Sequence, residues 1–302
     1  MQSEIKDIPT VLIAGGSGLI GTALFQHLSH QGYRVIMLTR NPKKSTDVFW
    51  NPTAATMSLD QLDQVDILIN LVGENIGAGR WTKKRKAQII ASRVQSTKFL
   101  AAMLPKMSRL KYYIGASGIN CYGQLDDKVF SESQAYGSDF LSSVVQQWEE
   151  AHQDILKQVK GCVFRVSMVL TPHGGTLHYI KKPINLGFGA ILGSGHQNSP
   201  WIHIDDLCRM MHFAIDKNLT GTYNTFANYN TNKEMTILLA KWLRRPLFLP
   251  RVPGFLLKLL LGERAVLILA DLKASNQKIK DAGFSFNYSS LDEVFQSFFS
   301  KL

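Results

Sequence analysis

A glycine pattern near the start of the chain constrains the fold most. Gly15, Gly18 and Gly21 form G-x-x-G-x-x-G between an apolar run, TVLIAG, and a stretch with helical spacing, TALFQHLSHQG. At such a strand–helix junction the first glycine allows a tight turn, the second lets the backbone approach a pyrophosphate, and the third lets helix and strand pack closely. The helix N-terminus then faces the phosphates. The pattern predicts a dinucleotide site with contacts from Gly15, Ser17, Gly18, Leu19 and Ile20.

Strand-like and helix-like segments alternate over residues 10–170. Buried strands are expected in TVLIAG, RVIMLTR, VDILINLVG, KYYIGAS and GCVFRVSMVL, and a long helix is expected from Lys83 to Leu104. This alternation predicts an α/β, Rossmann-like fold with a doubly wound parallel sheet. We therefore expect a cofactor-binding Rossmann domain over residues 9–170, to which residues 200–230 return.

A smaller lobe is expected on the substrate side of this domain. Residues 171–199 are rich in glycine and lack regular periodicity, so we expect a loop-rich segment that lines a pocket. Residues 231–302 contain helical patterns such as NKEMTILLAKWLRRP and VPGFLLKLLLG. Together these segments predict a mainly helical C-terminal lobe.

The end of the second expected strand distinguishes between the two nicotinamide cofactors. An NAD site usually carries an acidic residue there, which binds the ribose 2′-hydroxyl. This chain has Thr39 and Arg40 instead, followed by Lys43 and Lys44. A guanidinium beside a hydroxyl suits a 2′-phosphate by its charge and its forked hydrogen bonds. The pattern favours NADP(H) over NAD(H); the alternative is that Arg40 is only a surface charge at a strand end.

The charge balance raises the question of a nucleic-acid partner. The formal net charge is +11 and the isoelectric point is about 9.5. Nucleic-acid-binding proteins share this balance, but it also suits a basic surface around an anionic cofactor. The basic run KKRK at residues 83–86 opens a helical pattern, and no nucleic-acid motif accompanies it. We therefore expect a small-molecule substrate and no nucleic acid.

Cysteine usage and the apolar segments indicate the compartment. Cys121, Cys162 and Cys208 are widely spaced and are not paired as metal ligands, which disfavours a disulfide framework or a metal site and suits a reducing compartment. The N-terminal MQSEIKDIPT is polar, and charged residues interrupt the late apolar run FLLKLLLGERAVLILADL. We expect a cytoplasmic protein with no metal and no membrane partner.

Several stretches along the chain together resemble one protein family. They include GGSGLIGTAL, LTRNP, INLVGENI, RWTKKRKAQIIASRVQSTKFL, FLSSVVQQWEEA, LGFGAILGSGHQNSPWIHIDDL and GTYNTFA. The C-terminal RRPLFLPRVPGFLLKLLLGERAVLILADLKAS and AGFSFNY also fit. The chain resembles the extended and atypical short-chain dehydrogenase/reductases, and more closely the NAD-dependent epimerase-like family with a C-terminal domain of the DUF1731 type. The resemblance covers nearly the whole chain.

This resemblance implies cofactor contacts beyond the glycine turn. They are Thr39 and Arg40 at the 2′-phosphate, Leu71, Val72 and Gly73 along the adenosine and ribose side, Arg93 reaching back from the following helix, and Met168 and Val169 near the nicotinamide. Members of the superfamily commonly form dimers through two helices that flank the central strands, so a homodimer is also implied.

The usual catalytic set of the superfamily is incomplete in this chain. A serine positions the carbonyl, a tyrosine exchanges a proton, and a lysine lowers the tyrosine pKa. Ser117, at the end of KYYIGAS, occupies the serine position, but the next helix, FLSSVVQQWEEA, contains neither member of Y-x-x-x-K. Tyr122 follows Ser117 closely and is the candidate acid; the alternative is that it only shapes the pocket.

Other residues are expected on the substrate side. They are Glu74, Arg80 and Trp81 after the third strand, Trp148 on the helix that normally carries Y-x-x-x-K, and His196 and Gln197 in the glycine-rich loop. Trp148 has helical spacing with Val144, so it alternatively packs in the core. His203, Asp205 and Asp206 suggest a base or a metal site, but a segment such as IHIDDL more often docks a C-terminal lobe.

These observations support two functions. The first is an NADP(H)-dependent oxidoreductase or epimerase-like enzyme that acts on a small polar substrate. The second is a sensor or regulatory protein that keeps the cofactor site and has lost the catalytic pair.

Overall fold

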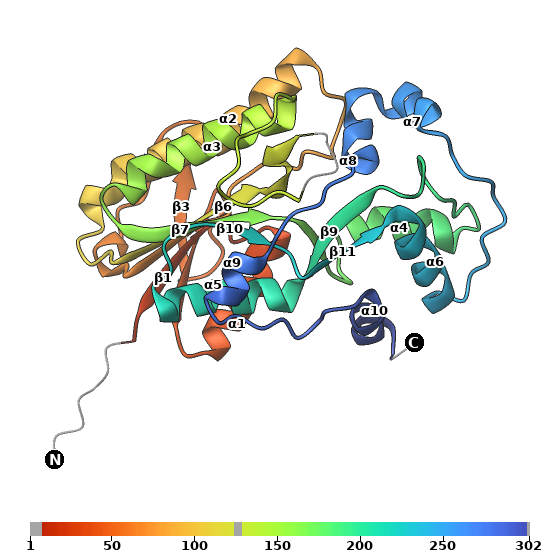
Figure 1. The fold of residues 1–302 in the computed structure, drawn as a ribbon. Helices are drawn as coiled ribbons and strands as arrows, with labels where there is room; N and C mark the ends of the chain where they lie inside the picture. Colours follow the sequence, from red (N-terminus) through yellow and green to blue (C-terminus); the bar gives the residue numbers. More distant parts are fainter. Residues whose placement is uncertain (1–7, 124–128, 301–302) are drawn as a thin grey trace.

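A parallel sheet forms the centre of the protein. The computed structural model describes residues 8–123 and 129–300, and within these ranges the main sheet has eight strands in the order β10-β7-β6-β5-β1-β2-β3-β4 (Figure 1). All neighbouring pairs are parallel except β3 with β4. The strands are β1 (Thr10–Ala14), β2 (Arg34–Thr39), β3 (Asp47–Asn51), β4 (Thr56–Met57), β5 (Ile67–Asn70), β6 (Tyr112–Gly118), β7 (Lys160–Val166) and β10 (Gly221–Thr225). The predicted Rossmann-like α/β fold is confirmed.

The strand order reverses beside β1. From β1 the chain runs outward through β2 and β3, then returns to β5 on the other side of β1 and continues to β6 and β7. In open α/β sheets, ligands bind in the crevice at the carboxyl ends of the strands where the order reverses. Gly15 directly follows β1, and Leu71 directly follows β5. The topology therefore brings together two segments that the sequence analysis assigned to the cofactor.

Helices cover both faces of the sheet. On one face lie α1 (Leu19–His30) and α5 (Ile204–Lys217), and on the other lie α2 (Lys83–Met103) and α3 (Phe140–Leu156) (Figure 1). Short 3-10 turns connect some of the elements: η1 (Leu62–Gln64), η2 (Leu104–Lys106), η3 (Ile119–Tyr122) and η4 (Gly262–Ala265). The predicted long helix ends one residue before its expected limit, because η2 begins at Leu104 with Pro105 at its second position.

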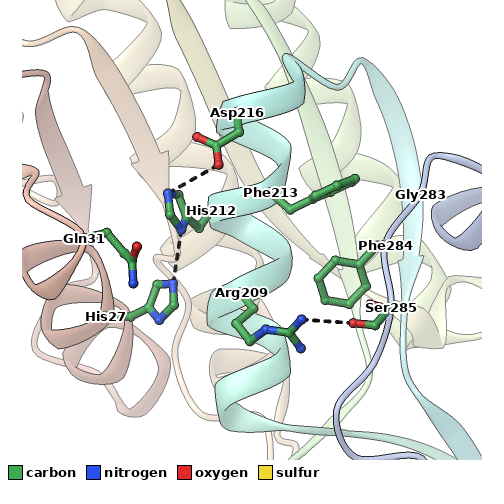
Figure 2. A pocket seen from close by; sticks show the side chains of 9 residues that line it. All are labelled: His27, Gln31, Arg209, His212, Phe213, Asp216, Gly283, Phe284 and Ser285. Carbon is green, nitrogen blue, oxygen red and sulfur yellow. Dashed lines mark hydrogen bonds and ion pairs between the residues drawn. The ribbon is translucent and has the colours of Figure 1, made fainter.

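A polar hollow of about 350 Å³ lies beside α1 and α5 (Figure 2). His27 Nε2 and His212 Nδ1 are 3.4 Å apart, and His212 Nε2 is 3.5 Å from Asp216 Oδ2. Arg209 Nη2 donates to the carbonyl oxygen of Ser285 at 3.2 Å. These polar groups are paired with one another, and the residues lining the hollow do not overlap with the predicted site residues.

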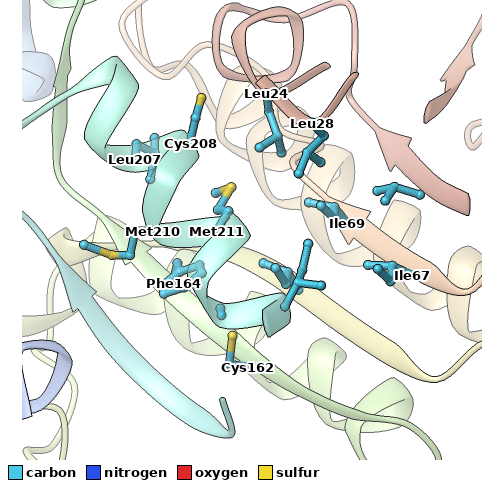
Figure 3. Packing of buried hydrophobic residues seen from close by; sticks show 14 of the residues in the cluster. Leu24, Leu28, Ile67, Ile69, Cys162, Phe164, Leu207, Cys208, Met210 and Met211 are labelled. Atoms are coloured by element: carbon cyan, nitrogen blue, oxygen red, sulfur yellow. The ribbon is translucent and has the colours of Figure 1, made fainter. Parts of the chain in front are cut away.

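The strands are buried on both faces, as their continuous apolar runs require. Val11 and Ile13 of β1 belong to the core on the α1–α5 side, and the alternate residues Leu12 and Ala14 belong to the opposite core. Successive side chains of a strand point to opposite faces, so a strand covered by helices on both sides is apolar throughout. Figure 3 shows the α1–α5 side, where Leu24 and the other α1 residues pack with those of α5.

The C-terminal lobe combines a small sheet with several helices. Its strands pair in the order β11-β9-β8. The elements are β8 (Met168–Leu170), α4 (Gly175–Asn185), β9 (Asn198–His203), β11 (Asn228–Thr231), α6 (Asn232–Trp242), α7 (Gly254–Leu261), α8 (Val266–Leu269), α9 (Gln277–Asp281) and α10 (Leu291–Phe299). Among residues 8–123 and 129–300, no helix has both the length and the apolar composition needed to cross a bilayer. The predicted helical lobe is confirmed, and its boundaries at residues 171 and 231 stay predictions.

One segment expected to be loop-rich contains a helix. Helix α4 occupies Gly175–Asn185 within the 171–199 segment, and Leu177 and Ile184 bury its inner side. The glycines at its start and Pro183 inside it hid the helical period from the sequence analysis. The expectation of little regular structure was wrong here, because packing of two apolar residues outweighs the weak helix propensity of this segment.

The IHIDDL segment docks the C-terminal residues. Asp206 is fully buried, and its carboxylate accepts backbone hydrogen bonds from Asn287 and Tyr288 at 3.0–3.1 Å. The ring of His203 stacks on Tyr288 with 3.7 Å between ring centres, and its Nδ1 accepts from the backbone of Asp205. The docking role expected for this segment is therefore confirmed.

Candidate functional site

The turn between β1 and α1 has two positions that only glycine fits. Gly15 has a φ of +82°, and a Cβ there would lie 2.9 Å from the backbone carbonyl carbon of Leu71. A Cβ at Gly21 would lie 2.4 Å from the carbonyl oxygen of Gly15. Both neighbours are backbone atoms, so neither contact is relieved by a side-chain rotation. Glycine at these positions therefore keeps the turn close to the end of β5 and the helix close to the turn.

The first turn of α1 leaves its backbone N–H groups available to an anion. Gly18 is the N-cap, no side chain in the described chain caps this end, and the first turn contains no acidic residue. Ser17, Gly18 and Leu19 are exposed, and Ile20 is half-buried. Unpaired N–H groups and the positive end of the helix dipole favour a phosphate at such a position.

Arg40 follows β2 with an uncommitted guanidinium. Its side chain is exposed and forms no hydrogen bond or ion pair within the part of the chain that the structure describes. The Thr39 hydroxyl accepts a hydrogen bond from the backbone of Asn41 at 3.2 Å. The carboxylate of Asp47 accepts from the backbone N–H groups of residues 43–44 at 2.8 and 3.0 Å, which fixes the loop that follows. Arg40 therefore projects from an ordered turn with its charge unpaired.

Asn70 holds the segment after β5 against the glycine turn. Its side chain is fully buried, its Nδ2 donates to Thr97 Oγ1 at 2.9 Å, and its Oδ1 accepts from the backbone of Val72 at 3.1 Å. The Leu71 N–H donates to the carbonyl oxygen of Ala14 at 2.9 Å. Leu71 and Val72 are half-buried at the crevice beside β1.

Arg93 reaches from α2 to the segment that follows β5. Its Nη2 donates to the carbonyl oxygen of Glu74 at 3.0 Å, and its Cζ lies 5.1 Å from the ring centre of Trp148, which is cation–π geometry. A Cβ at Gly73 would lie 3.0 Å from Arg93 Cζ, so the glycine leaves room for the guanidinium. Burial lowers the pKa of Arg93 to about 10, which leaves it charged at neutral pH. Three predicted site residues, Gly73, Arg93 and Trp148, are thus brought together.

Ser117 belongs to a buried charged network. Its hydroxyl donates to Glu149 Oε1 at 2.7 Å, and Arg165 forms a forked pair with the same carboxylate, Nε to Oε1 at 2.8 Å and Nη2 to Oε2 at 2.9 Å. Burial alone would raise the pKa of Glu149, but the hydrogen bonds and charge of Arg165 outweigh it and the pKa is lowered. Glu149 is therefore an ionised carboxylate, and the Ser117 proton is committed to it.

Tyr122 is part of the same network. Its hydroxyl donates to Asn224 Oδ1 at 2.7 Å and accepts from Arg165 Nη1 at 3.0 Å. Burial raises the pKa of Tyr122, so the phenol stays protonated. Tyr136 donates to Glu149 Oε2 at 2.8 Å from the loop before α3. The phenol protons of both tyrosines are therefore committed to acceptors inside the protein.

Comparison with known proteins agrees with this architecture. The sequence profile described as "NAD dependent epimerase/dehydratase family" matches residues 11–230, and a "Domain of unknown function (DUF1731)" matches residues 252–298. The chain belongs to the NAD dependent epimerase/dehydratase family. An epimerase family protein of Staphylococcus haemolyticus is 34% identical over 295 residues, with 94% of this chain and 97% of the relative covered.

A solved structure extends this likeness to three dimensions. The human epimerase family protein SDR39U1, crystallised with NADPH, superposes with a TM-score of 0.86 at 28% identity, covering 97% of this chain and all of that one. The mouse SDR39U1 protein is 32% identical over 288 residues, covering 93% of this chain and 96% of its own length. The resemblance stated from the motifs is thus confirmed over nearly the whole chain.

The start of α4 connects β8 to the start of α1. Met168 and Val169 open β8 and are half-buried. The start of α4 lies between β8 and the start of α1, since a Cβ at Gly175 would lie 3.2 Å from a methyl of Leu19 and 3.6 Å from the carbonyl oxygen of Val169. The predicted Leu19 and Val169 therefore lie on neighbouring parts of the crevice.

The residues after β5 divide into exposed and buried ones. Glu74 pairs with Arg85 of α2, and Arg80 is exposed. The Trp81 ring packs edge-on against Phe140 at 5.1 Å between ring centres, and its Nε1 donates to the carbonyl oxygen of Ile76 at 2.8 Å. Trp81 is thus a packing residue between α2 and α3 in this structure, and its substrate contact stays a prediction.

Of the two residues predicted in the glycine-rich loop, one is exposed and the other is buried. His196 is exposed. Gln197 is buried, and its Nε2 donates to the carbonyl oxygens of Leu192 at 2.9 Å and Ile268 at 3.2 Å, while its Oε1 accepts from Ser194 at 3.0 Å. Gln197 therefore shapes the loop, and His196 is the side chain that the loop presents outward.

Sequence reasoning missed the charged partners in the core. The sequence patterns assign no role to Glu149, which follows Trp148, and they place Arg165 in an apolar strand. A signal was present, because an arginine within GCVFRVSMVL must find a buried partner if the strand is internal. The role of Asn70 was also missed, although a polar residue at the end of a buried strand must find hydrogen-bond partners.

Acidification is expected to destabilise the protein through His152. This residue is fully buried, its Nε2 donates to the carbonyl oxygen of Ala116 at 2.9 Å, and its Nδ1 accepts from the Tyr113 hydroxyl at 2.7 Å. Burial lowers its pKa to about 4. The unfolded chain therefore takes up a proton first, and lowering the pH from 7.5 to 5 is expected to remove about 2 kcal/mol of stability.

Urea unfolding at several pH values measures this effect. A His152→Gln variant should lose about 2 kcal/mol less than the wild type between pH 7.5 and 5. Replacement of the exposed His178 by glutamine is the control and should leave the pH dependence unchanged. Equal slopes for wild type and His152→Gln would show that another group dominates.

Proposed function

We propose that this chain binds NADP(H) across the carboxyl ends of β1, β2 and β5 and uses it for hydride transfer with a small polar substrate. One observation carries the proposal: the glycine turn leaves no room for side chains at Gly15 and Gly21, and Arg40 projects with an unpaired charge from the strand end where an NAD site carries an acid. The NADPH in the human relative supports it.

The residues present fit this cofactor. The exposed N-terminus of α1 with Ser17, Gly18 and Leu19 would hold the pyrophosphate. Thr39 and Arg40 would bind the 2′-phosphate, since a guanidinium offers a forked set of donors to phosphate oxygens. The further residues in this proposal are Ile20, Leu71, Val72, Gly73 and Arg93 along the adenosine and ribose side, and Met168 and Val169 at the nicotinamide.

The proton side of the reaction depends on the buried network. When bound, NADPH supplies a hydride, and reduction of a carbonyl also needs a proton. Ser117 donates to Glu149, so toward a substrate it offers lone pairs and accepts a hydrogen bond from a hydroxyl. Tyr122 could deliver a proton only if its bond to Asn224 is broken. We assign six residues to the substrate side of the crevice: Glu74, Arg80, Trp81, Trp148, His196 and Gln197. Trp81 and Gln197 would shape the walls of the substrate pocket.

The same commitment of protons favours a second candidate function. The hydroxyls of Ser117 and Tyr122 are both satisfied inside the protein, so neither is poised to act on a carbonyl. A protein that binds NADPH and responds to its level needs the crevice but no proton donor. This alternative is an NADPH-binding sensor or regulatory protein.

The Arg40→Ala variant tests the cofactor assignment. We expect NADPH binding to weaken by about 1.5–3 kcal/mol, since a hydrogen-bonded charge is lost, while NADH binding is unchanged. Fluorescence titration with both nucleotides measures this. Arg34→Ala is the control, because it removes an exposed arginine from the other end of β2, where the guanidinium donates to Gln61 and Gln64. Equal weakening of NADH by Arg40→Ala would contradict the 2′-phosphate assignment.

Turnover separates the enzyme from the sensor. Wild-type protein that binds NADPH is screened with small carbonyl compounds and alcohols by the change in NADPH absorbance. Oxidation or reduction of the nucleotide with any of them supports the enzyme. Tight binding with no turnover across a broad panel supports the sensor, and failure to bind either nucleotide overturns both.

A further inference from the structure

A surface in the C-terminal lobe carries exposed apolar side chains that the cofactor crevice does not explain. The exposed fractions are 80% for Phe248, 45% for Leu249, 73% for Phe255, 74% for Leu259 and 59% for Leu260. We call residues 244–260 the basic–apolar surface. Single exposed leucines are ordinary, but a group of this size within one short segment marks a place that a partner covers.

Helix α7 presents this surface from a fixed position at the margin of the molecule (Figure 1). Leu257 is the only buried residue of this helix. Before the helix, a backbone hydrogen bond of 2.9 Å joins Gly193 to the carbonyl oxygen of Val252. After it, Arg264 donates to the carbonyl oxygen of Gly77 at 2.9 Å. Both ends of α7 are therefore held by the rest of the protein, and Phe255, Leu259 and Leu260 are exposed.

The surface is also positively charged. The stretch from residue 235 to residue 262 contains no aspartate or glutamate. Its basic residues, all exposed, are Lys241, Arg244, Arg245, Arg251 and Lys258. The next acidic residue, Glu263, pairs with Lys86 of α2. Exposed apolar and cationic groups therefore occur together in a stretch that contains no acidic residue of its own; the carboxylate of Asp292 contacts its beginning, where it accepts a hydrogen bond from Trp242 at 2.9 Å.

We propose that the basic–apolar surface binds the face of a membrane that contains anionic phospholipid. Apolar side chains that enter the interface together with lysines and arginines that meet lipid phosphates are the combination that holds peripheral proteins on bilayers. The charges that interrupt the apolar run led to the prediction that the protein has no membrane partner. Such charges exclude a membrane-spanning helix. A short helix that lies on the membrane surface uses them to bind lipid phosphates.

Two other arrangements fit the surface less well. A second copy of the chain would place two clusters of like charge against each other, which is unfavourable. A span is impossible for α7, because its eight residues rise about 12 Å and the hydrocarbon core is about 30 Å thick. The membrane face satisfies both the apolar and the charged groups.

Co-sedimentation with vesicles tests the proposal on the full chain. The probes are phosphatidylcholine vesicles and vesicles in which part of the phosphatidylcholine is replaced by phosphatidylglycerol. We expect binding to the second kind, weakened by high salt, and little binding to the first. The double variant Phe255→Ser with Leu259→Ser, and separately Arg251→Gln with Lys258→Gln, should each weaken binding at least about tenfold.

Matched controls lie outside the surface. Leu59→Ser removes an apolar side chain that is 54% exposed. Lys106→Gln removes an exposed charge just after the C-terminal end of α2. Both should bind vesicles like the wild type. Absence of binding to phosphatidylglycerol vesicles, or binding as tight as that of the wild type by either double variant, would overturn the proposal. Self-association of the wild type in light scattering, abolished by the serine variant and without vesicle binding, would assign the surface to a second copy instead.

Discussion

Replacing Glu149 by alanine is expected to lower the free energy of unfolding by about 3–5 kcal/mol. Arg165 is 3% exposed, and without the carboxylate its guanidinium would stay buried with no counter-charge. Breaking a buried pair by removing one partner costs more than the pair contributes, because the remaining ion cannot be solvated. Ser117 and Tyr136 would lose their acceptor as well. Urea unfolding at pH 7.5 measures the loss.

A double variant separates the pair from its surroundings. When Glu149→Met is combined with Arg165→Met, both charges leave, and the double variant should be more stable than the sum of the two single changes by about 1–3 kcal/mol. Strict additivity would show that the two side chains do not interact in the folded protein. A cost below about 1 kcal/mol for Glu149→Ala would show that water reaches the pair, as at a protein surface.

The main fold follows from local patterns in the sequence. Continuous apolar runs specify strands buried on both faces, and the glycine turn specifies where the first helix meets the first strand. Helix α4 could not be found in this way, since Gly175 and Pro183 weaken its propensity and only packing of Leu177 and Ile184 forms it. Tertiary contacts therefore decide the structure where local preference is weak.

The polar core shows where sequence patterns stop being informative. Ser117, Glu149 and Arg165 come from two strands and a helix, and only the folded sheet brings them within hydrogen-bonding distance. A charged residue in an apolar run indicates that the residue has a buried partner, but it does not identify that partner. The resemblance to the family predicts a site role for Ser117 but does not identify its partner, Glu149 of α3, which accepts the hydrogen bond of the Ser117 hydroxyl.

Replacing Gly15 by alanine is expected to weaken NADPH binding at least about tenfold, equivalent to about 1.4 kcal/mol. The new Cβ would lie 2.9 Å from the carbonyl carbon of Leu71, and the backbone at residue 15 has a φ of +82°. Relief of this contact must separate the glycine turn from the segment after β5, and both would line the proposed cofactor site. Fluorescence titration with NADPH measures the change.

Gly32 supplies a control with the same backbone strain. It has a φ of +85°, and a Cβ there would meet nothing within 4 Å. Both alanine variants carry the left-handed penalty of roughly 1–2 kcal/mol in stability. Gly32 follows the far end of α1, so Gly32→Ala should bind NADPH like the wild type. If the two variants bind NADPH equally, the approach of Gly15 to Leu71 does not matter for the cofactor, because strain alone is common to both.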